Sequence, residues 1–359
     1  MSKQIRSIIT GTGSYIPEKV VRNEDFLEWE FYGNNGEKLA KANQVIVDKF
    51  EAITTIAERR HVPGNLKTSD IATFAAQAAI QSAGIDPETL DYIIFAHNFG
   101  DIAQGKRELD IVPTLAARVK HQLKIANPYA VAYDLPFGCP GWVQGMIQAN
   151  YYIKSGDAKK VLVIGAEVLS RVCDPHDRDS MIYADGAGAV LLEALETDEE
   201  VGILAHKTRS DTLDHAHMLF MGNSYNEDIN PHTHFLKMYG RKLYQYALTN
   251  VPTAMQACLE KSGVPLANIK KILIHQANGK MDEAILQRFY KLYGEKAPED
   301  VMPMTVSYLG NSSVATVPTL LDLILRDELK PHQIGKGDDI IFASVGAGMN
   351  INAIVYRWH

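Results

Sequence analysis

One cysteine of the sequence, Cys139, stands at a position suited to nucleophilic chemistry. An extended apolar run, NPYAVAYDL, precedes it, and a helix-forming run, PGWVQGMIQANYYIKSG, follows it. A thiol in the first turn of a helix faces unpaired backbone N–H groups and the positive end of the helix dipole, which favour the thiolate. Pro140 suits the first helical position, and Gly138 permits a tight turn. A buried structural cysteine is the alternative, and this stretch alone leaves the two interpretations even.

Two later segments place polar side chains at a strand end and in a turn. KKILIHQANG puts His275 directly after a β-branched run, so we expect it at a strand end, where loops build sites. SYLGNSSVATVP puts Asn311 in a glycine-flanked polar turn before a helix. Taken singly, His275 fits a hydrogen-bonded core histidine, and Asn311 fits a helix cap. Each signal alone is weak.

The elements that must position these residues alternate between strands and helices. Several strand-like runs are continuously apolar, as strands covered on both faces should be. The alternation predicts a layered α/β fold with a largely buried sheet. Strands are expected at 6–16, 91–99, 130–135, 160–169, 187–194 and 270–277, a terminal hairpin at 338–348 and 351–358, and helices at 69–85, 114–125, 140–156, 249–264, 281–294 and 314–329.

The two halves of the chain share one order of elements. DYIIFAHNFG near the front and KKILIHQANG near the back both follow a helix that ends in small residues. We therefore expect an N-terminal lobe, 1–200, that carries the cysteine, and a C-terminal lobe, 201–359, that carries the histidine and the asparagine. Two stretches lack clear periodicity, 30–50 and 205–240, and both are expected to be loops of the kind that often bind ligands.

Composition excludes several classes of protein. The 359 residues carry a formal charge of −7, and the 36 basic residues form no long cluster that would neutralise a nucleic-acid backbone. No apolar run reaches membrane-spanning length, and the start lacks the apolar core of a secretory signal, so we expect a cytoplasmic protein without a membrane partner. Cys139, Cys173 and Cys258 are few, odd in number and far apart, which predicts reduced thiols.

Histidines gather in the second irregular stretch. Histidine pairs are common in loops, and no carboxylate-histidine motif accompanies these, so we expect no metal site and treat them as loop residues near the cavity. They are His215, His217, His232 and His234.

Together the motifs resemble the β-ketoacyl-acyl carrier protein synthase III family of the thiolase-like superfamily. The order is the cysteine corner, then HQAN, then GNSSVATVP. GTGSYIPEKVVRN resembles the family's opening strand and turn, and LSRVCDPHDRDSMIYADGAGAVLLE resembles its central segment. The resemblance spans nearly the whole chain. It implies a thiolase-like fold of two similar α/β lobes in an α-β-α-β-α layering.

The resemblance also implies a mechanism. Cys139 would attack an acyl thioester and carry the acyl group. His275 and Asn311 would donate hydrogen bonds to the carbonyl of a malonyl thioester and stabilise the enolate left when CO₂ departs. The enolate would then attack the acyl-cysteine. The backbone N–H of Cys139 and one from the loop SVGAGMN would form the oxyanion hole, with Ala347 in the donor position and Gly346 as the alternative.

The family holds the arm of coenzyme A or acyl carrier protein beside this site. By resemblance, Asn278 would bond the pantetheine arm and Arg178 would lie near the nucleotide, whereas Gly240 and Tyr244, in a loosely matching block, would line the same tunnel. The substrates would be thioesters of coenzyme A or phosphopantetheine, with no tightly bound cofactor. The family resemblance also implies a homodimer.

Three features depart from the family pattern. IVPTL matches a segment that closes the partner's acyl pocket, and Val112 replaces a bulky aromatic there, which predicts room for medium or long acyl groups. An ordinary interface contact is the alternative role for Val112. Phe137 and Trp142 are bulkier than usual beside the cysteine and shape the pocket floor or the core, core being the better expectation. The stretch before AERRHV is unfamiliar, so carrier recognition there is left open.

These departures leave several functions open. The first is a synthase III-like condensing acyltransferase, for fatty acid or secondary metabolite biosynthesis. The second is a specialised ketosynthase that joins two acyl chains and cyclises them, as in dialkylresorcinol or cyclohexanedione formation. An acyltransferase that loads a carrier without condensing is less favoured, because simple transfer has less need of an enolate hole. A non-catalytic carrier-binding subunit is disfavoured because all three polar residues are present.

Overall fold

The first sheet of the protein is built from the N-terminal half of the chain. The structure is a computed structural model that describes residues 3–359. Strand order in this sheet is β1, β7, β6, β4, β5. β4 runs parallel to β5 and β6, and β7 runs antiparallel to β1 and β6. The bounds are β1 Gln4–Tyr15, β4 Tyr92–Ala96, β5 Val131–Leu135, β6 Lys160–Val168 and β7 Asp185–Thr197.

The second sheet is built from the C-terminal half, in the order β11, β12, β13, β8. β11 and β12 are parallel, and the other pairs are antiparallel. The β12–β13 pairing confirms the predicted terminal hairpin. The bounds are β8 Gly202–Ser210, β11 Ile269–Ile274, β12 Asp339–Gly346 and β13 Asn350–Arg357.

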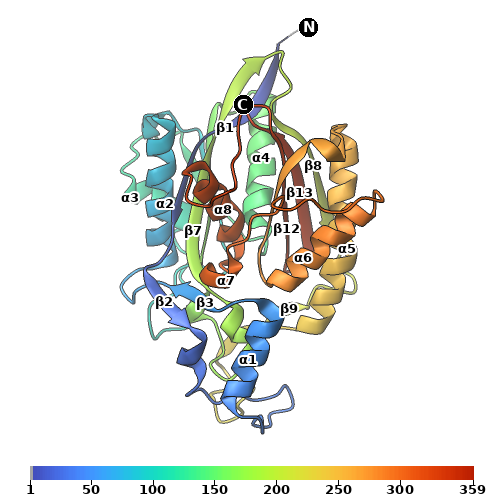
Figure 1. Ribbon diagram of the computed structural model, residues 1–359. Helices are drawn as coiled ribbons and strands as arrows, with labels where there is room; N and C mark the ends of the chain where they lie inside the picture. The colour runs from blue at the N-terminus through green and yellow to red at the C-terminus, as the bar shows by residue number, and fades with distance from the viewer. Residues whose placement is uncertain (1–2) are drawn as a thin grey trace.

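Helices separate and cover the two sheets (Figure 1). α4 and α8 lie between the sheets and contact strands of both, whereas α2 and α3 cover the outer face of the first sheet. α5 covers the outer face of the second sheet and packs against α6. This is the predicted α-β-α-β-α layering. The bounds are α2 Thr68–Ala83, α3 Leu115–Gln122, α4 Gly141–Ser155, α5 Gly240–Ser262, α6 Gly279–Lys291 and α8 Thr316–Leu325.

The sequence of α8 is largely apolar because this helix is buried. Its residues from Thr316 to Ile324 are all buried, as a helix enclosed on every side requires. The side chains between the sheets form one apolar cluster that includes Trp142, Leu320, Phe342 and Tyr356. Trp142 therefore belongs to the core, as expected. Cys139 precedes α4 and Asn311 precedes α8, so the central layer fixes the relative position of these two residues.

Smaller elements project from one end of the layers, at the bottom of Figure 1. Two predictions are wrong here. The stretch 30–50, expected as a loop, contains the start of helix α1, and 205–240 contains part of β8 and the antiparallel pair β9–β10. The bounds are β2 Lys19–Arg22, α1 Asn43–Thr54, β3 Glu58–His61, β9 Leu219–Asn223, β10 His234–Met238 and α7 Val306–Leu309.

A membrane span would need a long apolar helix. Within residues 3–359, none of the helices combines the necessary length and hydropathy.

Candidate active site

The cysteine corner is held by close contact between two backbone segments. Gly138 adopts a φ of +67°, a conformation that favours glycine. A Cβ built on Gly138 would lie 2.9 Å from the backbone of Ala347, and one on Gly346 would lie 2.5 Å from the nitrogen of Cys139. The two glycines therefore let the turn after β12 lie directly against the corner between β5 and α4. Cys139 itself precedes the helix, which begins at Gly141 with Pro140 as its cap residue.

The structure brings Cys139, His275 and Asn311 to one cavity of about 980 Å³. His275 follows β11, and its backbone N–H donates to the carbonyl of Ala343 at 2.8 Å. Asn311 lies in the turn between α7 and α8, and its Oδ1 accepts a hydrogen bond from the backbone N–H of Ser313 at 2.8 Å. Because the oxygen of this amide is occupied, its NH₂ group is the part that can serve a ligand in the cavity.

Burial controls the ionisation of the site. It raises the pKa of the Cys139 thiol to about 11, outweighing a hydrogen bond from Ser313 that lowers it. Burial also lowers the pKa of His275 to about 4. Burial therefore opposes the thiolate that the helix terminus favours. At neutral pH the pair is a thiol and a neutral imidazole, and that imidazole has one N–H to donate.

The two residues proposed for the oxyanion hole, Gly346 and Ala347, both line the cavity. Gly346 ends β12, and Ala347 begins the following turn. The side chain of Asn350 donates to the carbonyl of Ala347 at 2.9 Å, which holds that turn. Both residues thus lie beside Cys139, where a backbone donor is needed.

The predicted arm-binding residues line the same cavity. Asn278 caps α6, its Oδ1 accepting from the N–H of Met281 at 3.1 Å, so its NH₂ remains for a ligand. Arg178 begins a short 3-10 helix, Arg178–Ile182, and its side chain is largely exposed. Gly240 begins α5, and Tyr244 lies one turn further along that helix.

Sequence reasoning missed several residues of this cavity. Lys41, Lys49 and Arg241 add positive charge to its lining, and the two lysines come from the unfamiliar stretch before and within α1. Asn98 and Ser313 lie beside the nucleophile. Arg241 follows Gly240 in the loosely matching block, so the sequence could have indicated this arginine. The two lysines lie in a segment with no family counterpart.

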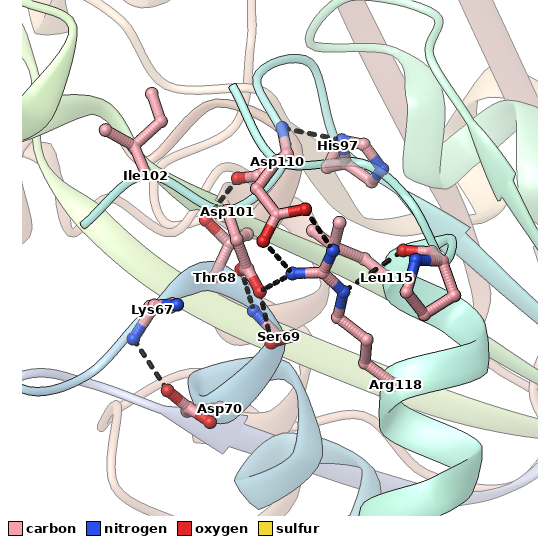
Figure 2. Close-up of polar contacts among 12 residues, drawn as sticks. Lys67, Thr68, Ser69, Asp70, His97, Asp101, Ile102, Asp110, Leu115 and Arg118 are labelled. Carbon is pink, nitrogen blue, oxygen red and sulfur yellow. Dashed lines mark hydrogen bonds and ion pairs between the residues drawn. The ribbon is translucent and has the colours of Figure 1, made fainter. Parts of the chain in front are cut away.

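The two predicted pocket-gate residues, Val112 and Phe137, are absent from the cavity lining of the described chain. Val112 is 83% exposed and Phe137 is half-buried. Val112 lies in an excursion, residues 97–114, between β4 and α3. Figure 2 shows Arg118 binding two aspartates of this excursion, Asp101 and Asp110. Arg118 contacts Asp101 at 2.8 Å and also binds Asp110 and the carbonyl of Pro113. A role for Val112 at a partner's pocket stays a prediction, and so does a role for Phe137 at the pocket floor.

The remaining cysteines and histidines lie elsewhere. Cys139, Cys173 and Cys258 are all free thiols. The four histidines do not line the cavity within residues 3–359, and a place near it stays a prediction. His215 instead packs edge-on against Tyr246 of α5. The four are His215, His217, His232 and His234.

Comparisons with known proteins agree along the chain. Residues 133–212 match the family model described as 3-oxoacyl-[acyl-carrier-protein (ACP)] synthase III, and residues 259–358 match the model of its C-terminal part. A β-ketoacyl-[acyl-carrier-protein] synthase III of Ruegeria pomeroyi is 33% identical over 98% of this chain and 99% of its own.

Solved structures of similar proteins have the same fold. The 3-oxoacyl-[acyl-carrier-protein] synthase III of Aquifex aeolicus is 28% identical and superimposes with a TM-score of 0.78, covering 98% of this chain and 100% of its own. The synthase III of Thermus thermophilus is also 28% identical, with a TM-score of 0.80 and coverage of 98% and 99%. The architecture is therefore thiolase-like.

Proposed function

Because the chain belongs to the β-ketoacyl-[acyl-carrier-protein] synthase III family of condensing acyltransferases, we propose that Cys139 accepts an acyl group and passes it to a second thioester. In the first half-reaction the sulfur of Cys139 attacks the thioester carbonyl, and the carrier leaves as a thiol with the proton. In the second, a malonyl-type thioester loses CO₂ and its enolate carbon attacks the acyl-cysteine, which releases the Cys139 thiolate.

The single observation that carries this proposal is the meeting of Cys139, His275 and Asn311 at one cavity. A neutral His275 and the NH₂ of Asn311 supply two donors for one thioester carbonyl, where enolate charge develops. Backbone donors beside Cys139 serve the tetrahedral oxyanion. Loss of the thiol proton must accompany acyl transfer, since burial keeps the free thiol protonated.

Thioesters of coenzyme A or of the phosphopantetheine arm of a carrier protein are the proposed substrates, with no tightly bound cofactor. The cationic lining from Lys41, Lys49, Arg178 and Arg241 supports this, because both carriers bear phosphate groups. Three free cysteines support a reducing, cytoplasmic setting. We further propose a homodimer in which Val112 faces the partner's pocket.

The test is the mass of the intact protein after incubation with acyl thioesters from acetyl to long-chain and β-ketoacyl. Wild type should gain one acyl group, and Cys139→Ala should gain none, because the nucleophile is gone. Cys173→Ala is the matched control and should load like wild type. Loading of Cys139→Ala, or no adduct with any thioester, would overturn the covalent mechanism.

The same panel separates the remaining alternatives. A chain-joining, cyclising ketosynthase would load a long-chain or β-ketoacyl group and release a product containing two acyl chains. A loading acyltransferase would return the acyl group to a carrier without carbon–carbon bond formation. If only acetyl loads, the expectation of a roomier pocket at Val112 is wrong.

A further inference from the structure

A chain of buried polar groups runs from the nucleophile into the first sheet. Glu167 of β6 is fully buried, and its Oε2 accepts from the backbone N–H of Asn98 at 3.0 Å and from its Nδ2 at 2.7 Å. The same Nδ2 donates to Oγ of Ser313 at 3.3 Å. Oγ of Ser313 in turn lies 3.3 Å from Sγ of Cys139 and donates to it.

The direction of these hydrogen bonds is fixed by chemistry. An ionised carboxylate can only accept, so Glu167 holds the NH₂ group of Asn98, rather than its oxygen, toward Ser313. A serine hydroxyl has one proton, and because its oxygen already accepts from Asn98, that proton is free to point at the sulfur. Each member of the chain therefore sets the orientation of the next one.

The backbone of Ser313 is also held in an unusual conformation. Its φ is 54°, in the left-handed region that residues with a side chain seldom adopt. Its N–H donates to Oδ1 of Asn311. One residue thus orients the amide of Asn311 through its backbone and the sulfur of Cys139 through its side chain, and this explains why the surrounding structure sustains the conformation.

We propose that Ser313 is a further active-site residue, which donates a hydrogen bond to the Cys139 thiolate as it forms, and that Glu167, acting through Asn98, is the positioning residue for this donor. The inference deepens the proposed function and rests on it for the role of Cys139 as nucleophile. It concerns the ionisation of the Cys139 thiol, which can be measured without any thioester.

The charge of Glu167 adds a second effect. Burial raises the pKa of Glu167 to about 7, and its Oε1 has no hydrogen-bond partner within residues 3–359, which leaves a place for a proton. The ionised carboxylate opposes the thiolate. Of the titratable groups nearby, His97 lowers the pKa of Glu167. Asp185 of β7 lies opposite Val168, the neighbour of Glu167 in β6. The side chain of Asp185 is therefore on the face of the sheet away from Glu167.

The test follows alkylation of Cys139 by iodoacetamide from pH 5.5 to 10, with the modified residue identified by peptide mass. Ser313→Ala should react about tenfold more slowly below the pKa of the thiol, because loss of the donor raises that pKa by about one unit. Ser313→Gly, which suits the left-handed backbone but also lacks the hydroxyl, should react as slowly as Ser313→Ala. Ser312→Ala changes the neighbouring serine and should match wild type.

Glu167→Gln tests whether the charge of Glu167 changes the pH dependence of alkylation, an effect that a purely structural role would not produce. The amide still accepts from Asn98 but cannot ionise. Wild type should show a bend in its pH profile near 7, where the carboxyl ionises and resists the thiolate. Glu167→Gln should lack this bend and react faster than wild type above pH 7. If this variant does not fold, Asn98→Ala should reproduce the Ser313→Ala profile.

Two results would overturn the inference. One is a Ser313→Ala profile that coincides with that of Ser312→Ala. The other is a bend that persists in folded Glu167→Gln or, where that variant does not fold, an Asn98→Ala profile that coincides with wild type. Failure of the proposed function is separate, because it appears as absence of acyl loading in wild type while these alkylation profiles still differ.

Discussion

His275 and Asn311 are expected to act in only one of the two half-reactions. Both line the cavity beside Cys139, and we propose that they stabilise the enolate of the second half-reaction rather than assist attack by sulfur. We expect His275→Ala and Asn311→Ala to load an acyl group at Cys139 and to lose condensation by about 10²- to 10³-fold, the usual effect of removing one such donor. Intact mass measures loading, and product formation from a malonyl thioester measures condensation.

A surface histidine provides the control for this prediction. His121 is exposed on α3, so His121→Ala should retain both activities. Equal loss of loading and condensation in His275→Ala and Asn311→Ala would contradict the division, because it would place both residues in the first half-reaction.

Taken singly, Cys139, His275 and Asn311 gave weak signals, and they became catalytic candidates through the order of their motifs and its resemblance to a known family. Sequence alone could not predict the neighbours of Cys139. Asn98, Glu167 and Ser313 come from three distant parts of the chain, and their chemistry appears only when β4, β6 and the turn before α8 meet. Sequence also could not show the burial that opposes a thiolate at Cys139, because burial is a property of the folded molecule.

At the scale of elements, the conformation of the excursion before α3 depends on one cation, the guanidinium of Arg118. Asp101 is buried and accepts from Ser69 as well as from Arg118, as Figure 2 shows. Arg118→Met should remove the cation and leave this carboxylate uncompensated, lowering the free energy of unfolding by about 3 kcal/mol. Urea denaturation monitored by circular dichroism measures the change.

A surface ion pair is the comparison for this loss. Lys330 lies 3.1 Å from Asp327, and both side chains are largely exposed, so Lys330→Met should cost below about 1 kcal/mol. Equal effects of the Arg118 and Lys330 substitutions would show that the excursion does not depend on the buried pair.

Most strands and helices were predicted because apolar periodicity is a local property. The exceptions are instructive. β9 and β10 are short and pair with each other across a polar loop, so their partner, rather than their own pattern, makes them strands. α5 begins at Gly240, nine residues before the predicted start, because its first turns are polar and lie at the cavity mouth. Neither feature is visible in a short window of sequence.

At the scale of the molecule, we propose two lobes divided at about residue 200, since one sheet ends at Thr197 and the other begins at Gly202. The lobes share the central helices as a common layer. Cys139 precedes one of these helices and Asn311 lies before the other, so the site exists only when the lobes are docked.

The proposed homodimer gives a further prediction. The excursion exposes Leu109, Ile111 and Val112, and Tyr129 is exposed just before the edge strand β5. In sedimentation velocity, wild type should have twice the chain mass of 39.8 kDa, and Val112→Lys should weaken that association. Leu213→Lys alters a residue that is 95% exposed elsewhere and should not. A monomeric wild type would contradict the proposal.

The pairing of β1 with β7 sets the order in which a newly made chain can fold. Gln4 lies opposite Thr197, and the ribosome adds the intervening residues at about 5–20 per second, which takes roughly 10–40 s. During that interval β1 has emerged but its neighbour in the sheet has not. Cys139 is synthesised within it, so the sheet that positions the nucleophile cannot be complete until this time has passed.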